Sequence, residues 1–118
     1  MGHPNVNIVN LVRRLTFMKF VITRRRKDAF LMLPAEKQTE LGEGALAFIE
    51  KQRKAGKCKE IYVDVDLQGG GSIWELESDT EVAKLMLENP IAPFMDLDVR
   101  LVIDWDIAVK AMSEASRQ

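Results

Sequence analysis

The sequence has very few of the residues on which much small-protein chemistry depends: among 118 residues it holds one cysteine and one histidine. Because Cys58 is alone, no disulfide can form within the chain. His3 lies near the N-terminus, and no group of residues has the spacing of a metal site. These scarcities predict a cytoplasmic protein that contains neither a disulfide framework nor a resident metal.

Long hydrophobic runs and an excess of one charge are also missing. No stretch approaches the roughly 20 apolar residues that span a bilayer, and Arg13-Arg14 follow the first mildly apolar run, whereas a secretory signal has its charges first. The 17 basic and 18 acidic residues give a net charge of -1. Nucleic-acid-binding domains usually carry a basic excess. We therefore expect a protein that binds neither nucleic acid nor membranes.

The chain length predicts a single domain with an N-terminal extension. Residues 1–17 form the extension, in which residues 5–10 alternate and allow a short added strand. The regular pattern begins at Met18, so the predicted domain covers residues 18–118. No internal repeat or low-complexity segment divides it.

Residues 18–118 predict the order β-α-β-β-α-β with a helical tail, which is the ferredoxin-like α+β arrangement. The first helix begins at Pro34, a favoured first-turn residue, and ends at Gly56, where a left-handed cap fits. The second begins at the capping box Ser78–Glu81 and stops at Asn89-Pro90. The predicted strands cover residues 18–23, 58–66, 72–77 and 97–105, with a turn made by the glycines at 69–71.

The strands alternate, as is typical of a four-stranded antiparallel sheet with helices on one face. The opposite face then carries carboxylates, an arginine and a phenol. Packed against a partner's sheet, it lines a barrel-shaped cavity; left alone, it is a solvated sheet with cross-strand pairs. The helix-covered set is Ile61, Val63, Val65, Trp74, Leu76, Val99, Leu101, Ile103 and Trp105, and the open set is Tyr62, Asp64, Asp66, Ile73, Glu75, Glu77, Arg100, Val102 and Asp104.

Four residues of the open set are candidates for chemistry. In a partly dry cavity a carboxylate has a raised pKa and can move protons near neutral pH, so Asp64 or Glu75 is the candidate base. Tyr62 is the candidate acid or oxyanion donor, and Arg100 can hold a substrate carboxylate in a bidentate grip. The alternative stays open that these charges form solvated pairs or salt bridges at a dimer interface.

Other residues favour structural roles. Cys58 has no histidine near it in the predicted domain and is expected to be a buried thiol. Residues 24–27 (RRRK) are expected to form a solvated loop, and Trp74 and Trp105 to lie in the core. Asp106 is expected to cap the tail helix.

Residues 72–99, SIWELESDTEVAKLMLENPIAPFMDLDV, resemble the second half of a muconolactone isomerase-like domain. The most specific part is the Pro-x-x-Pro-aromatic-Met-Asp turn that begins at Pro90. Met18 at the start of the first strand and Pro34 at the first helix fit the same pattern, so the resemblance covers residues 18–105. It implies a homodimeric α/β barrel, often assembled into larger rings, and a cofactor-free proton shift in a small unsaturated lactone of aromatic catabolism.

Three functions remain open at this point. The leading one is a cofactor-independent isomerase of the muconolactone isomerase-like kind, acting on a small unsaturated lactone or on an enol or carbonyl compound. The same barrel also hosts cofactorless monooxygenases of polyketide-like substrates. A non-catalytic module for small-ligand binding or assembly is favoured by the absence of histidine from residues 18–118.

Overall fold

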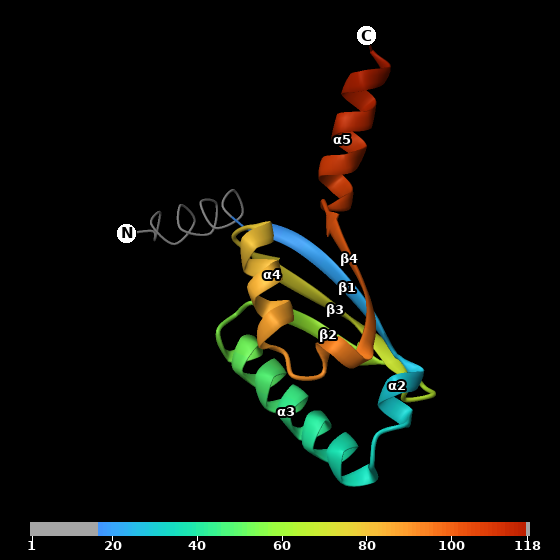
Figure 1. Cartoon of the computed structure of the whole chain (residues 1–118). Coiled ribbons are helices and arrows are strands. Elements are labelled where there is room, and N and C mark those ends of the chain that lie inside the picture. The colour runs from blue at the N-terminus through green and yellow to red at the C-terminus, as the bar shows by residue number, and fades with distance from the viewer. Residues whose placement is uncertain (1–16, 118) are drawn as a thin grey trace.

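The protein, described here by a computed structural model over residues 17–117, is an α+β chain built on a four-stranded antiparallel sheet. Across the sheet the strands lie in the order β2-β3-β1-β4, and along the chain the main elements follow the β-α-β-β-α-β order of ferredoxin-like folds (Figure 1). The expected strand at residues 5–10 and His3 lie outside the described residues. The elements are β1 (Met18–Arg26), α2 (Asp28–Leu31), α3 (Ala35–Lys54), β2 (Cys58–Val63), β3 (Gly69–Leu76), α4 (Asp79–Glu88), a 3-10 helix (Ala92–Phe94), β4 (Met95–Val102) and α5 (Trp105–Ser116).

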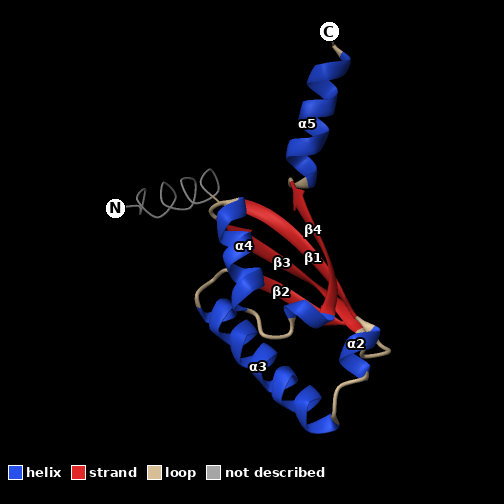
Figure 2. Ribbon diagram, viewed as in Figure 1, coloured by secondary structure: helices blue, strands red, loops and turns tan. Residues whose placement is uncertain are grey.

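Helices α3 and α4 lie on one face of the sheet, which we call the helix-side face; the other is the open face (Figure 2). Helix α3 packs against β2, and α4 packs against β3. Strand β4 is an edge strand that pairs with β1 and contacts the 3-10 helix. The two helices therefore cover the β2 and β3 side of the sheet more fully than the β4 side.

The hydrophobic core lies between the helix-side face and these two helices. Leu76 on β3 is fully buried, and Trp74 two residues before it is 4 % exposed. The indole Nε1 of Trp74 donates a hydrogen bond of 2.7 Å to Ser72 Oγ, which satisfies two polar groups inside the core. The core cluster consists of Phe20, Ile22, Cys58, Trp74, Leu76, Val82 and Leu85.

Helices α3 and α4 begin and end where local signals predict. Helix α3 starts after Pro34, and Gly56 beyond its end has a φ of 75°, the left-handed conformation that glycine adopts without strain. At α4, Ser78 Oγ accepts a hydrogen bond of 3.3 Å from the Glu81 N–H. Gly44 in α3 permits a close approach, because an added Cβ would lie 3.0 Å from Pro90 Cγ.

The predicted boundaries of β1 and of the hairpin are wrong. Strand β1 continues through Arg26 instead of ending at Thr23, and the short α2 follows it. The glycines at 69–71 lie inside β3, and the turn is made by residues 64–68. Asp64 N–H donates a hydrogen bond to Gly69 O at 2.8 Å, and Leu67 N–H donates one to Asp64 O at 2.8 Å. These two bonds close the turn before the three glycines, which are therefore strand residues.

The end of the chain also differs from the prediction. Strand β4 ends at Val102, and Trp105 begins α5 instead of ending the strand. Trp105 is 76 % exposed, so it is not a core residue, and Ile103 and Val65 are exposed as well. The N-cap position of α5 is held by Asp104, not by Asp106. The alternating pattern of residues 97–105 thus continues past the true end of the strand.

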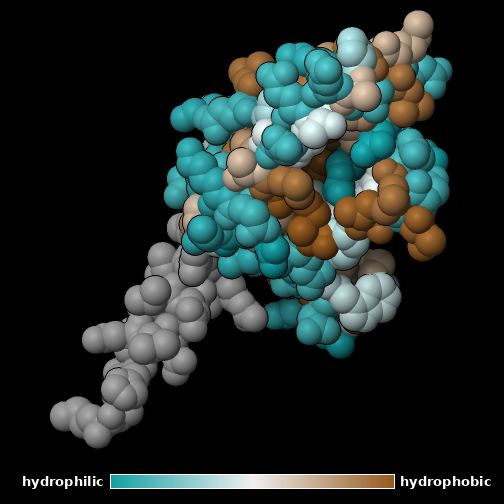
Figure 3. Space-filling model, turned by 90° about the horizontal axis from the view of Figure 1, so that it is seen from below, coloured by the Kyte–Doolittle hydropathy of each residue, from teal (hydrophilic) through white to brown (hydrophobic). Residues whose placement is uncertain are grey.

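The surface of the described chain carries scattered apolar side chains. Seen from below, hydrophobic residues gather near the middle of a mostly hydrophilic face (Figure 3). Single exposed residues such as Met32 just after α2, Leu46 on α3 and Leu87 on α4 are ordinary for a globular protein. Within residues 17–117, no helix is both long enough and apolar enough to cross a membrane.

Candidate functional site on the open face

The strand register places the open-face residues in rows that run across the sheet. One row joins Tyr62, Gly71, Thr23 and Asp98 across the four strands. The next row joins Glu60, Ile73, Val21 and Arg100, and a third joins Glu75, Lys19 and Val102. Val21 and Ile73 thus form an apolar patch at the centre of the open face.

Three of the four candidate residues lie around this central patch. Tyr62 belongs to the row on one side of the central row, and Glu75 belongs to the row on the other side. Each of these rows is about 7 Å from the central row, which is the length of two strand residues. Arg100 lies at the end of the central row, on the edge strand β4. Their backbones are too far apart for direct contact, and their side chains border the Val21–Ile73 patch from three directions.

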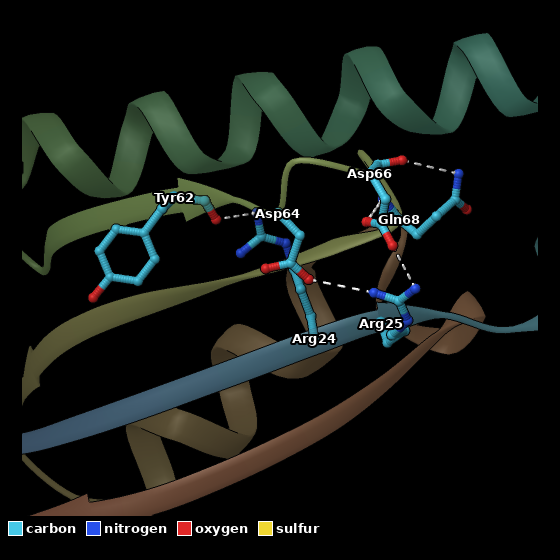
Figure 4. Close-up of polar contacts among 6 residues, drawn as sticks. All are labelled: Arg24, Arg25, Tyr62, Asp64, Asp66 and Gln68. Carbon is cyan, nitrogen blue, oxygen red and sulfur yellow. Dashed lines mark hydrogen bonds and ion pairs between the residues drawn. The ribbon is translucent and has the colours of Figure 1, made fainter.

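Asp64 and Asp66 occupy a corner of the sheet, beyond the end of β2 (Figure 4). Arg25 on β1 reaches both carboxylates, with Nη1 3.4 Å from Asp64 Oδ2 and Nη2 2.7 Å from Asp66 Oδ2. Gln68 N–H also donates to Asp66 Oδ1 at 2.9 Å. This corner is therefore a cross-strand ion-pair network that closes the hairpin turn.

The hydrogen bond from Arg25 holds the pKa of the Asp66 carboxyl below its usual value, and the backbone N–H of Gln68 adds to this effect. A lowered pKa keeps Asp66 ionised at neutral pH. It is then unable to act there as a proton donor. The hydrogen bonds to Asp66 that lower this pKa also hold the hairpin turn closed.

We expect Arg25→Gln to raise the pKa of Asp66 toward its ordinary value, because the largest cause of the lowering is removed. Since the folded-state pKa is lowered, Asp66 contributes stability above its usual pKa, and this is lost as the pH falls through the folded value. NMR titration of the Asp66 side chain measures the change. Lys37→Gln, which removes an ion pair on α3, is the control and should leave this titration unchanged; an unaltered Asp66 titration in Arg25→Gln contradicts the assigned cause.

Tyr62 and Arg24 occupy space that two glycines of β3 leave open. An added Cβ at Gly71 would lie 3.0 Å from Tyr62 Cε2, so the phenol ring rests over Gly71 on the open face. On the helix-side face, Arg24 lies over Gly70, and its Nη2 donates a hydrogen bond of 3.1 Å to Tyr62 O (Figure 4). Burial lowers the pKa of Arg24. The glycines therefore position the phenol by admitting side chains on both faces.

Glu75 and Arg100 both have charged partners within the chain. Glu75 Oε2 lies 3.7 Å from Lys59 Nζ, and its side chain is 35 % exposed. Arg100 Nε donates to Asp98 Oδ2 at 2.8 Å on the exposed edge strand. Glu75 is the more covered of the two candidate bases, because the side chain of Asp64 is 51 % exposed.

Asp64 lies apart from the other predicted residues. Asp64 lies in the row of Gly69, and Gly69 comes six residues before Glu75 along β3. The rows of Asp64 and Glu75 are therefore about 20 Å apart. The described chain thus groups Tyr62, Glu75 and Arg100 around the central patch and places Asp64 at the corner. Arg25, expected in a solvated loop, is instead a β1 residue that pairs with Asp64, and the run of three arginines at 24–26 carries no alternation that could have revealed this.

Cys58 is the buried structural thiol that the sequence predicts. It is 4 % exposed, it belongs to the core cluster, and burial raises its pKa. Its Sγ donates to Glu60 O at 3.6 Å. A raised pKa leaves the thiol protonated and weakly nucleophilic.

No cluster of three or more metal-ligating side chains occurs within residues 17–117. A scan of the sequence against protein-family models finds no match, and a search of curated proteins finds no similar sequence. The candidate site therefore stands on its own geometry: a phenol, a carboxylate and a guanidinium that border an apolar patch on the open face of a four-stranded sheet.

Proposed function

We propose that this chain is a cofactor-independent proton-transfer enzyme of the muconolactone isomerase-like kind, which acts as a homodimer on a small unsaturated lactone or related carbonyl compound. The observation that carries the proposal is the placement of Tyr62, Glu75 and Arg100 around the Val21–Ile73 patch. These are the three group types that proton transfer beside a carbonyl needs: a base, an oxyanion donor and an anchor.

In this proposal a second copy covers the open face. Two sheets packed face to face lie about 10 Å apart, which encloses the central patch and removes water from it. With water excluded, the hydrogen bonds and charge interactions that Glu75, Tyr62 and Arg100 would make with a bound substrate are stronger than at an open surface. The sheet of one chain, open on this side, is suited to such packing because its centre is apolar and its charges lie toward the rim.

The proposed reaction moves one proton and requires no cofactor. The Glu75 carboxylate takes a proton from a carbon next to the substrate carbonyl, and the electron pair of that C–H bond forms an enolate. Tyr62 donates a hydrogen bond to the enolate oxygen while Arg100 holds a substrate carboxylate. Return of the proton to a different carbon shifts the double bond and regenerates Glu75. Asp64 is the second candidate base, at the corner of the same face.

The test is proton NMR of the full chain with muconolactone and related unsaturated lactones in heavy water. A shifted double bond, or deuterium uptake next to the carbonyl, is the expected result. Glu75→Gln should reduce the rate about 100-fold or more while leaving the fold intact, and Asp64→Asn tests the alternative base. Glu43→Gln, on the exposed side of α3, is the matched control. Full activity in both Glu75→Gln and Asp64→Asn rejects these assignments.

A non-catalytic binding or assembly module is the second candidate. It is favoured because Arg100 is already bound to Asp98 and Asp64 to Arg25, so charges of the open face are neutralised within the chain. In this case a lactone raises the melting temperature without forming product. The same NMR panel, combined with thermal unfolding, separates the two functions.

A further inference from the structure

Strand β4 and helix α5 carry a continuous series of exposed apolar side chains. By register, Leu97, Val99 and Leu101 lie opposite Arg24, Ile22 and Phe20 of β1, so they point to the helix-side face. Leu101 is nevertheless 60 % exposed, whereas its partner Phe20 is 5 % exposed. The helix-side face of β4 is thus an apolar strip that α3 and α4 leave uncovered.

Helix α5 is amphipathic, with one apolar side and one charged side. At 100° per residue, Trp105, Val109 and Met112 fall along one side of α5 together with its alanines. The charged residues Asp106, Lys110, Glu114 and Arg117 fall on the opposite side. None of the residues of α5 is buried, and the helix projects away from the sheet (Figure 1). An amphipathic helix in this position has an apolar side without a partner in its own chain.

The connection between the two elements favours a partner in another chain. Only Ile103 and Asp104 separate β4 from α5. Asp104, the N-cap residue, pairs with Lys19 Nζ on β1, which holds the start of α5 at the end of the sheet. From this anchored start α5 points outward and does not turn back over the strip on its own β4 (Figure 1).

The dimensions of the helix and the strip agree. A helix of 12 residues is about 18 Å long, and the β4 strip from Leu97 to Leu101 spans about 14 Å. The exposed parts of the apolar side chains of β4 and α5 amount to an area on the order of 800 Å², which is what each partner buries in an interface of standard size. These side chains are Leu97, Val99, Leu101, Ile103, Trp105, Val109 and Met112; Ile107 falls beside Glu114 on the charged side of α5 and is not counted.

We propose that α5 of one chain lies on the uncovered β4 strip of a second copy, and that the second copy's α5 lies reciprocally on the first. The helix α5 and the β4 strip are on the same chain, so a two-fold axis satisfies both reciprocal contacts at once and makes this contact self-complementary between two copies. Trp105 becomes covered, and the charged side of each α5 faces water. This contact lies on the helix-side face and is independent of the open-face packing invoked for catalysis.

The test combines the mass of the full chain, measured by sedimentation, with acrylamide quenching of Trp105, taken as the difference between the wild type and Trp105→Phe. At micromolar concentration we expect at least a dimer with a protected Trp105. Leu101→Glu changes only the strip, and the double variant Val109→Glu/Met112→Glu changes only the helix. We expect each of them to make quenching of Trp105 several-fold stronger. Ser113→Glu, on the charged side of α5, should leave it protected. Circular dichroism verifies that each variant is folded.

Each alternative gives a different result, and each overturns the proposal. A Trp105 that is freely quenched in the wild type at every concentration means that α5 is unpartnered. Protection of Trp105 in a wild-type monomer means that α5 folds back on its own chain. If Leu101→Glu leaves Trp105 protected while the double helix variant exposes it, then two α5 helices pair with each other and not with the strip. Because the readout is Trp105 and not activity, failure here leaves the proposed proton transfer untouched.

Discussion

Leu76→Ala is expected to lower the free energy of unfolding by about 2–5 kcal/mol. Leu76 is fully buried on the helix-side face of β3, within the cluster that includes Val82 and Leu85 of α4. Truncation removes apolar contacts and leaves a cavity that the surrounding strands and helix fill only partly. Urea unfolding at a fixed protein concentration measures the loss, since self-association also changes the apparent stability.

The matched control for this prediction is Leu87→Ala on α4. Leu87 is 88 % exposed, so the same chemical change should alter the free energy of unfolding by no more than about 0.5 kcal/mol. Equal losses in the two variants contradict the placement of the core between β3 and α4. A large loss only at Leu87 indicates that its side of α4 is covered in solution.

Gly70→Ala is expected to destabilise the protein by about 3 kcal/mol or more, or to prevent folding. An added Cβ at this position would overlap the carbonyl oxygen of Tyr62 on β2 and the guanidinium of Arg24. The flexible arginine can move, but the Tyr62 carbonyl belongs to the backbone of the neighbouring strand. Accommodating the methyl group therefore requires β2 and β3 to separate locally, which weakens their pairing.

Gly42→Ala is the control, because it makes the same change where space is open. No heavy atom lies within 4 Å of an added Cβ at Gly42, which occupies an interior position of α3. Alanine is a better helix former, so this variant should gain about 1 kcal/mol. Thermal and urea unfolding compare the two alanines directly. A Gly70→Ala variant as stable as the wild type is incompatible with the close approach of β2 to β3 at this position.

Local signals predicted the helices and the order of the elements. Pro34 and Gly56 limit α3, and Ser78 with Glu81 begins α4, because capping and left-handed caps act on backbone groups within about four residues. Alternation predicted the two faces of β2 and β3 correctly for Tyr62, Trp74 and Glu75. These features depend on neighbours in the sequence, so the sequence was sufficient to predict them.

The hairpin between β2 and β3 shows why other features could not be predicted. Three consecutive glycines are a strong turn signal, yet the turn is made by residues 64–68 with Leu67 at a φ of 63°. The glycines are needed inside β3 because the Tyr62 ring and the Arg24 side chain lie over them. Arg25 then fixes the turn through Asp64 and Asp66. Arg24 and Arg25 are about 40 positions away in the sequence, so only the fold reveals their effect.

The sequence by itself determined the β-α-β-β-α-β order and the limits of helices α3 and α4. The tertiary structure alone decided which polar residues border the Val21–Ile73 patch, that Asp64 lies apart from Glu75, and that Trp105 is exposed on a projecting helix. The physical reason is the sequence separation over which each effect acts. Propensity and capping are set within a few residues, whereas register and the covering of a strand depend on contacts between segments far apart in the chain.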